Sequence, residues 1–250
     1  MEVFSKWVKV DNEGLKIDAY VAMPQTAGIY PGVIVIQEIF GVNEHIQSVT
    51  KKIASEGYVA IAPAIYQRQA PGFAVGYSDE EVIEGRKYKV QTQAGELLSD
   101  MQACIAYLYS QPQVKQSGVG TIGFCFGGHV VYLASTLADV AATASFYGAQ
   151  IATWCPGEDE PTISRTKDIK GTIYAFFGTA DPLIPNKQTE QIERELIKHN
   201  IDHEVFRYQG ATHGFMRDCE ASRRHRRPNY NPDAAKDAWK KVLDLFSQKL

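Results

Sequence analysis

Short apolar runs alternate with amphipathic stretches along most of the chain. Gly32–Gln37 reads GVIVIQ, a continuous β-branched run typical of a strand buried on both faces of a sheet. Similar or alternating runs predict further strands at Lys16–Met23, Tyr58–Ala62, Val119–Phe124, Ala142–Tyr147, Thr172–Phe177 and Glu204–Tyr208. Met1 to Val10 also alternates polar and apolar residues, without the basic start and apolar stretch of a signal peptide.

Helix signals occupy the stretches between these strands. Asn43 can cap a helix through about Ser55, and Ser78 can cap a polar helix with acidic residues in its first turn. Further helices are predicted over Ala94–Ser110, Gly127–Leu137, Lys187–His199 and Asp233–Lys249. Gln67–Tyr77 is predicted as a loop. The stretch that follows the strand Ala142–Tyr147, up to Lys170, is predicted to be irregular.

This alternation predicts an α/β fold with a mostly parallel central sheet and helices on both faces. The sequence shows no repeat, linker or low-complexity tract, so we expect a single domain over residues 1–250. Ligands of such sheets bind at the carboxyl ends of the strands. Functional side chains should therefore directly follow strands.

Composition and charge narrow the class of protein. Hydrophobic residues at 44% and charged residues at 22% allow a full core without disulfides or a metal. A net charge of -3 gives no general attraction to nucleic acid or to an anionic membrane, and no apolar run is long enough for a span. The four cysteines form no C-x-x-C pair, which indicates free thiols in a reducing cytosol. We expect a cytoplasmic protein with no metal and no cofactor.

The sharpest motif is Gly123-Phe124-Cys125-Phe126-Gly127-Gly128, between an apolar strand and an apolar helix. It fits a nucleophile elbow with Cys in place of Ser, where flanking glycines avoid clashes around a strained turn. The thiol of Cys125 would stand at a helix N-terminus, which favours thiolate, and the N–H of Phe126 could point at an oxyanion. Taken alone, the segment also fits a buried cysteine in a glycine-rich turn.

A second pattern overlaps the elbow. Gly118-x-Gly120-x-x-Gly123 matches the dinucleotide-binding fingerprint letter for letter. Its glycines lie before and within the strand, however, whereas that chemistry requires them at the helix N-terminus. We therefore do not expect a nicotinamide or flavin cofactor.

Two further residues follow predicted strands in an order that suits a catalytic triad. Asp181 follows Thr172–Phe177, and His213 follows Glu204–Tyr208 among small residues. Each alone fits a turn or a surface loop. Together with Cys125 they give the order nucleophile, acid, histidine of α/β hydrolases. Asp181 would orient His213, which would relay protons while Cys125 forms a thioester.

A second acid, Glu38, directly follows the buried strand Gly32–Gln37. A carboxylate there costs desolvation free energy unless it has a partner or a task. The N–H of the next residue, Ile39, lies where a second oxyanion donor is expected.

The chain resembles the dienelactone hydrolase family (carboxymethylenebutenolidases). The resemblance is carried by Asp181 and by the segments 37–43, 66–72, 123–128 and 210–215. The resemblance extends over essentially the whole chain. It implies a single α/β-hydrolase domain with a Cys–His–Asp triad. It also implies that Glu38 interacts with the resting thiol and helps to deprotonate it when a substrate arrives.

The chain departs from that family where the substrate carboxylate is held. One of two expected arginines matches Arg217, and Tyr88 matches a tyrosine on the substrate side. The other arginine aligns with Glu84, and the nearby Arg86 is not clearly on the same face. Loss of one arm of the clamp would cost about 1.5–3 kcal/mol. The triad therefore carries over, but the specificity for dienelactone does not.

Other possibilities stay open. The basic run 223–227 fits a solvated loop, an entrance that attracts anions, or an oligomer contact. A different cysteine enzyme such as a class I amidotransferase would place a Glu after the histidine, where Phe215 stands instead. A non-catalytic protein on this fold would lack a reactive thiol. We expect a small ester or lactone as substrate, possibly anionic, and a monomer or a small homo-oligomer.

Overall fold

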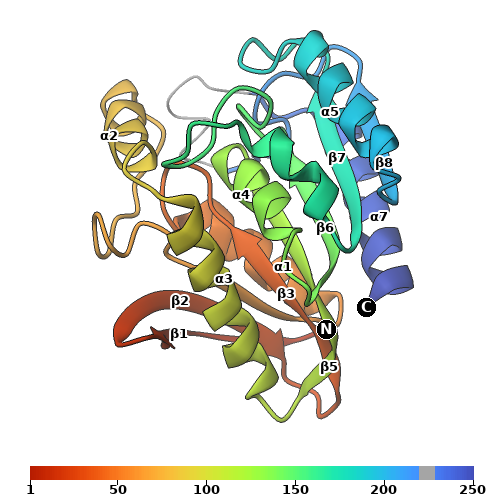
Figure 1. Cartoon of the computed structure of the whole chain (residues 1–250). Helices are drawn as coiled ribbons and strands as arrows, with labels where there is room; N and C mark the ends of the chain where they lie inside the picture. The colour runs from red at the N-terminus through yellow and green to blue at the C-terminus, as the bar shows by residue number, and fades with distance from the viewer. Residues whose placement is uncertain (220–228) are drawn as a thin grey trace.

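The computed structural model describes residues 1–219 and 229–250. Eight strands form one sheet in the order β1-β2-β4-β3-β5-β6-β7-β8. Six neighbouring strands run parallel from β4 to β8, whereas β1 and β2 are antiparallel additions at one edge (Figure 1). The strands are β1 (Val3–Asn12), β2 (Leu15–Pro24), β3 (Tyr30–Ile36), β4 (Val59–Pro63), β5 (Val114–Phe124), β6 (Val140–Phe146), β7 (Thr172–Gly178) and β8 (His203–Tyr208).

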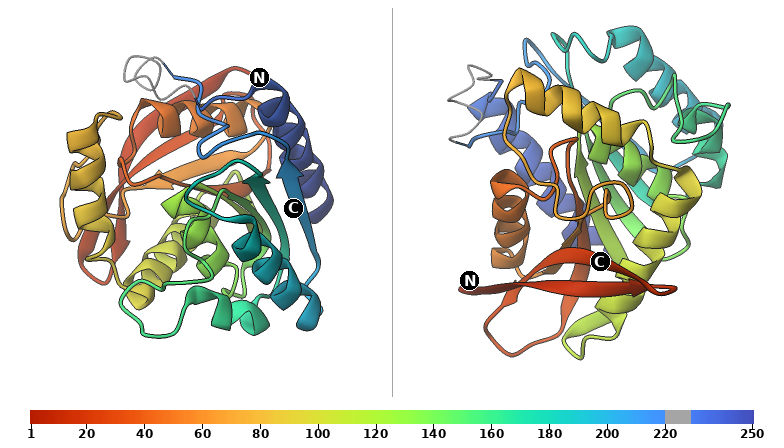
Figure 2. Two further views of the ribbon diagram at one scale, coloured as in Figure 1. Left: turned by 90° about the horizontal axis from the view of Figure 1, so that it is seen from above. Right: turned by 90° about the vertical axis from the view of Figure 1, so that its left-hand side faces the viewer.

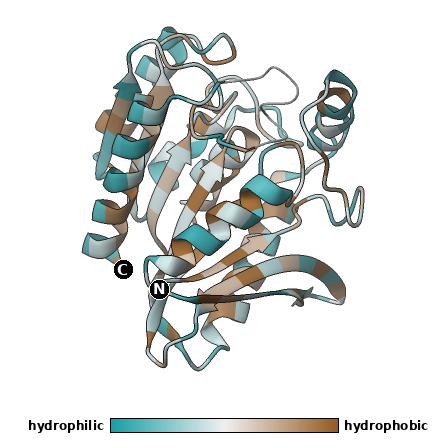
Figure 3. Cartoon of the chain, turned by 180° about the vertical axis from the view of Figure 1, so that it is seen from behind, coloured by the Kyte–Doolittle hydropathy of each residue, from teal (hydrophilic) through white to brown (hydrophobic). Residues whose placement is uncertain are grey.

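Helices cover both faces of the sheet, as predicted. α1 (Glu44–Ser55) and α7 (Pro232–Lys249) lie on one face, and α3 (Ala94–Tyr109), α4 (Phe126–Ala134) and α5 (Asn186–Lys198) on the other (Figure 2). Their apolar sides face the sheet and their polar sides face outward (Figure 3). Each helix thus buries its apolar stripe against the strands, which confirms the predicted α/β architecture.

Two elements of the structure were not predicted from the sequence. No strand was predicted before Lys16, yet the alternating first residues form β1, an edge strand with Phe4 and Trp7 half exposed. The pattern of an edge strand is weak because only one of its faces is buried. A short 3-10 helix, η1 (Thr162–Asp168), also interrupts the stretch predicted as irregular.

One helix does not lie against the sheet. α2 (Asp79–Lys89) projects from the body beyond the carboxyl ends of the strands (Figure 1). It begins with a capping box between Ser78 and Glu81, as its sequence predicts. Gly85 is its only buried residue, and a Cβ there would lie 2.3 Å from the carbonyl oxygen of Ile39. The backbone of α2 therefore lies directly on the loop that follows β3.

No helix in the described part of the chain is long and apolar enough to cross a membrane.

Candidate active site

The turn between β5 and α4 has the backbone geometry of a nucleophile elbow. Cys125 has φ 56° and ψ -115°, which lies outside the usual regions for a residue with a side chain. Such a conformation costs about 1–3 kcal/mol and persists only where its surroundings enforce it. Gly123 and Gly127 permit the close backbone packing of this turn, because a Cβ on Gly123 would lie 2.1 Å from the carbonyl oxygen of Gly127. The predicted sharp turn is thus present in the structure.

The predicted acid and histidine lie side by side. Asp181 follows β7 and His213 follows β8, and the Nδ1 of His213 donates to the Oδ2 of Asp181 at 2.8 Å. Both side chains are buried, and the other carboxylate oxygen accepts the backbone N–H of Leu183 at 2.8 Å. The ring of Tyr147 packs edge-on against that of His213, with 5.1 Å between centroids. These contacts fix the imidazole so that its Nε2 faces the cavity.

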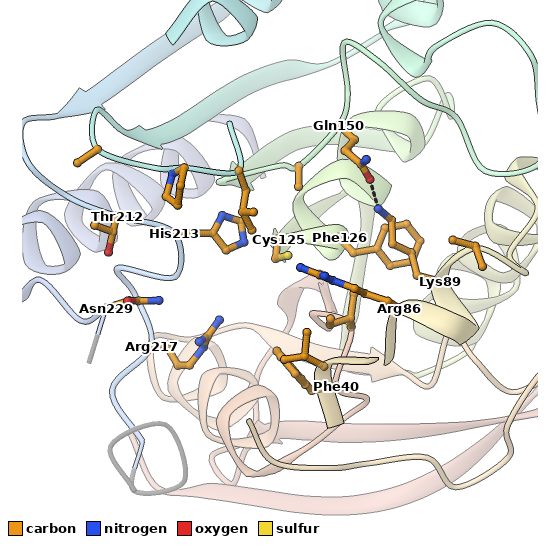
Figure 4. A pocket seen from close by; sticks show the side chains of 17 residues that line it. Phe40, Arg86, Lys89, Cys125, Phe126, Gln150, Thr212, His213, Arg217 and Asn229 are labelled. Carbon is orange, nitrogen blue, oxygen red and sulfur yellow. Dashed lines mark hydrogen bonds between the residues drawn. The ribbon is translucent and has the colours of Figure 1, made fainter. Parts of the chain in front are cut away.

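Cys125 and His213 meet in that cavity (Figure 4). No hydrogen bond of ordinary geometry joins Nε2 of His213 to another described residue. Burial lowers the pKa of His213, but the nearby Cys125 thiol and the Asp181 carboxylate outweigh burial and raise that pKa to about 10. The site therefore favours the imidazolium form of His213.

Both predicted oxyanion donors flank the thiol. Phe126 is the first residue of α4, so its N–H has no acceptor within the helix. Ile39 follows β3, the neighbour of β5 in the sheet, and both residues line the cavity. Two backbone N–H groups are thereby present in the lining of the cavity that also contains Cys125.

Glu38 is buried in an ion pair. Its Oε1 accepts from the Nη2 of Arg217 at 2.6 Å, and its Oε2 accepts from the Nε of Arg217 and the hydroxyl of Tyr77, each at 3.3 Å. Burial raises the pKa of Glu38, but the Arg217 guanidinium outweighs burial and holds that pKa below its usual value. The ring of Tyr77 lies 4.4 Å from the guanidinium carbon. Glu38 is therefore ionised.

This pairing changes two expectations. Among the described residues, the hydrogen bonds of Glu38 go to Arg217 and Tyr77, and none joins it to the Cys125 thiol. Arg217, predicted as a substrate contact, does line the cavity, but Glu38 neutralises its charge. The sequence placed these two residues at the site without showing that they bind each other.

Several buried polar groups around Glu38 were not predicted from the sequence. Tyr77 lay at the end of a predicted loop, His45 is buried in α1, and Tyr147 is buried directly after β6. The Nε2 of His45 and the hydroxyl of Tyr147 have no hydrogen-bond partner among the described residues. Burial lowers the pKa of His45 to about 4, so this ring is neutral. A single buried histidine gives no recognisable signal in one sequence.

The cavity has a volume of about 740 Å³, which suits a small organic molecule. Within the described residues its lining includes the Lys and Arg side chains of Arg86, Lys89 and Arg217 besides His213, and no Asp or Glu. No group of three His, Cys, Asp or Glu side chains in residues 1–219 and 229–250 could hold a metal ion.

Two predicted substrate-side positions lie outside the cavity lining. The hydroxyl of Tyr88 donates to Glu84 at 3.2 Å, and the Tyr88 ring packs against Phe73 at 4.9 Å between centroids. Arg86, which the sequence could not place on the substrate side, does line the cavity. The difference arises from helical phase, because Glu84 and Arg86 lie about 200° apart around a helix axis. The basic run 223–227 lies outside the described residues.

Comparisons with known proteins identify the family of this chain. The model of the dienelactone hydrolase family matches residues 17–250. A Synechocystis protein, provisionally named a carboxymethylenebutenolidase, is 54% identical over 250 residues, covering 100% of this chain and 99% of that protein. A Yersinia pestis protein of the same provisional name is 32% identical over 242 residues, covering 96% of this chain and 86% of its own length.

A solved structure has a similar fold. The crystal structure of a provisionally named dienelactone hydrolase from Klebsiella pneumoniae superposes with a TM-score of 0.86 at 27% identity, covering 99% of this chain and 100% of that one. The chain belongs to the dienelactone hydrolase family.

Proposed function

We propose that this protein hydrolyses a small ester or lactone through a thioester formed on Cys125. One observation carries the proposal: a cysteine in a strained left-handed turn shares a cavity with a buried, hydrogen-bonded His213–Asp181 pair. That arrangement positions a thiolate, a proton carrier and an orienting carboxylate for acyl transfer. The names of the relatives, which refer to a lactone hydrolase, support the same reaction class.

The chemistry would run in two halves. The Cys125 thiolate attacks the carbonyl carbon, and the backbone N–H groups of Ile39 and Phe126 stabilise the oxyanion. His213 then donates its proton to the leaving oxygen as the carbon–oxygen bond breaks and the thioester remains. In the second half, His213 takes a proton from water as the water attacks the thioester. The acid is released and the thiolate–imidazolium pair is restored.

Glu38 has a supporting part in this proposal. Its ionised carboxylate interacts electrostatically with His213 and holds the side chain of Arg217 at the cavity wall. We retain the hypothesis that Glu38 helps to deprotonate the thiol, which would require it to leave Arg217. Arg217 remains a candidate substrate contact on the same condition.

The test is turnover of dienelactone and of a panel of small neutral esters by the wild type and by Cys125→Ala. Cys104→Ala is the matched control, because Cys104 is fully buried in α3 and does not line the cavity. The proposal predicts turnover that Cys125→Ala abolishes and Cys104→Ala retains. A covalent acyl adduct on Cys125, detected by mass spectrometry after rapid quenching, would identify the thioester.

The alternatives give different results. A Cys125→Ala variant as active as the wild type would refute the nucleophile. Release of ammonia from glutamine, with no ester turnover, would favour an amidotransferase-like enzyme. A thiol at Cys125 that iodoacetamide alkylates no faster than a free cysteine, again with no turnover, would favour a non-catalytic protein.

A further inference from the structure

The turn between β7 and α5 forms one wall of the cavity, and its lining side chains are apolar although they are exposed. Ala180, Pro182 and Leu183 all line the cavity, and Leu183 keeps 47% of its surface accessible. The next residue, Ile184, is instead buried in the core. Adjacent exposed apolar side chains inside a cavity gain free energy when an apolar ligand covers them.

Hydrogen bonds fix this turn beside His213. The N–H of Ala180 donates to the carbonyl of Ala211 at 3.0 Å, two residues before the histidine. The N–H of Leu183 donates to one carboxylate oxygen of Asp181 at 2.8 Å, and the other oxygen accepts from His213 at 2.8 Å. Leu183 and the imidazole are therefore held by the same carboxylate, which sets the position of one relative to the other.

The position of His213 determines which part of an ester this wall would contact. A histidine that protonates the leaving oxygen must lie within hydrogen-bond reach of it. The alcohol part of a bound ester therefore begins on the His213 side of Cys125. Thr212 and His213 lie on one side of Cys125 in the cavity, and Phe126 lies on the other (Figure 4). The turn over residues 180–183, bonded to the chain around His213, thus lies on the alcohol side.

We propose that Pro182 and Leu183 form a subsite for an apolar alcohol part of the substrate. The inference rests on the proposed function of Cys125 and narrows its substrate class to esters of a neutral alkyl or aryl alcohol. The two side chains offer only hydrocarbon, which favours contact with an alkyl or aryl group and disfavours contact with a charge. In a lactone the leaving oxygen stays attached to the acyl part, so no separate alcohol would cover this wall. The wall therefore favours an open ester.

Three simple esters test the subsite. Ethyl acetate and hexyl acetate give the same acetyl-enzyme, and kcat/KM covers the steps up to acylation, so a difference in kcat/KM between them arises from the alcohol part. Ethyl hexanoate is an isomer of hexyl acetate that carries its long chain on the acyl part. Each kcat/KM is measured by titration of the released acid and divided by the rate constant for hydrolysis of the same ester by hydroxide, which removes differences in intrinsic reactivity.

We expect hexyl acetate to exceed ethyl acetate at least about tenfold on this scale, because its added methylene groups would be buried on the wall. We also expect it to exceed ethyl hexanoate. Leu183→Ala removes most of the apolar side chain but keeps the N–H that binds Asp181. This change should lower the ratio of hexyl acetate to ethyl acetate roughly threefold to tenfold.

Ile197→Ala is the matched control, because Ile197 is an exposed apolar residue of α5 that does not line the cavity. It should leave the ratio of hexyl acetate to ethyl acetate unchanged. A wild-type ratio near one, a preference for ethyl hexanoate, or a ratio that Leu183→Ala retains would overturn the subsite.

A second measurement does not depend on turnover. The Cys125→Ala variant is titrated with each ester, and NMR spectra of labelled leucine methyl groups report contact with Leu183. The Leu183 signals are identified by their loss when Leu183→Ala is added to this variant. Hexyl acetate should shift these signals until they saturate, and ethyl hexanoate should shift them less, because its long chain would lie on the acyl side.

This titration separates the subsite from the proposed function. If the wild type cleaves no ester, the proposed function fails while the Leu183 signals still decide the subsite. Signals of Leu183 that do not respond to hexyl acetate, or that respond equally to both isomers, would refute it.

Discussion

Arg217 and Glu38, which are 179 positions apart in the sequence, form a buried ion pair with 2.6 Å between Nη2 and Oε1. Neither side chain is more than 5% exposed. The pair joins the loop after β3 to the chain beyond β8, so it connects two walls of the cavity. Its contribution is both structural and electrostatic, because each residue keeps the other ionised in a buried position.

Removal of one partner should therefore be costly. Arg217→Met or Glu38→Gln alone should lower the free energy of unfolding by about 3–5 kcal/mol, because the remaining charge is buried without a counter-ion. The double variant should lose less than the sum of the two single losses. Urea denaturation measures the free energy of unfolding of the two single variants and of the double variant. As a control, Arg194→Gln removes a partner from an exposed pair and should change stability by less than about 1 kcal/mol. Additive losses in the double variant would show that the pair is not coupled.

The protonation of His213 gives a pH-dependent prediction. Because its pKa is raised to about 10, the imidazolium should persist through neutral pH in NMR spectra of protein with labelled histidine. The stability that this charged form contributes is complete below the unfolded pKa of about 6.5, and it is lost as the pH rises through the folded value. In Cys125→Ala the pKa of His213 should fall, because the thiol is the largest cause that raises it. An imidazole that is neutral at pH 7 in the wild type would contradict this.

Much of the fold and the centre of the site could be predicted because they depend on local patterns. Continuous β-branched runs show buried parallel strands, and parallel strands place the residues that follow them at one edge of the sheet. Cys125, Asp181 and His213 each follow such a strand, so their proximity follows from the topology.

Other parts depend on contacts that a single sequence does not encode locally. The Glu38–Arg217 pair joins residues far apart in the chain, and no local pattern links them. Which of Glu84, Arg86 and Tyr88 lines the cavity depends on how α2 is rotated about its axis. The burial of Gly85 against Ile39 determines that rotation. A mostly polar helix has no apolar stripe from which its phase could be predicted. Cellular location and oligomeric state remain predictions.

Asp181→Asn tests the orienting carboxylate. The amide would still fit the site, but it would remove the charge that stabilises the imidazolium and could favour the wrong tautomer of His213. We expect kcat for ester hydrolysis to fall by a factor on the order of 10²–10⁴, with a smaller change in KM. The pH at which His213 titrates should fall too, which a purely structural defect would not produce. Asp202→Asn, an exposed carboxylate of the β7–β8 region, serves as the control. An Asp181→Asn enzyme with full kcat would exclude Asp181 from the triad.

The glycines of the elbow make a final, purely steric prediction. A Cβ on Gly127 would lie 2.4 Å from the carbonyl oxygens of both Gln37 and Ile36, which are backbone atoms that cannot rotate away. Gly127→Ala must therefore push α4 from β3, and the loss of packing should cost several kcal/mol, on the scale of a disrupted core. Gly95→Ala is the matched control in the first turn of α3, where an added Cβ meets nothing within 4 Å. That change should be neutral or should stabilise the protein by up to about 1 kcal/mol, because alanine favours helix. Thermal unfolding of the two variants beside the wild type decides the matter. A Gly127→Ala protein as stable as Gly95→Ala would mean that the elbow is not packed against β3 as closely as the structure shows.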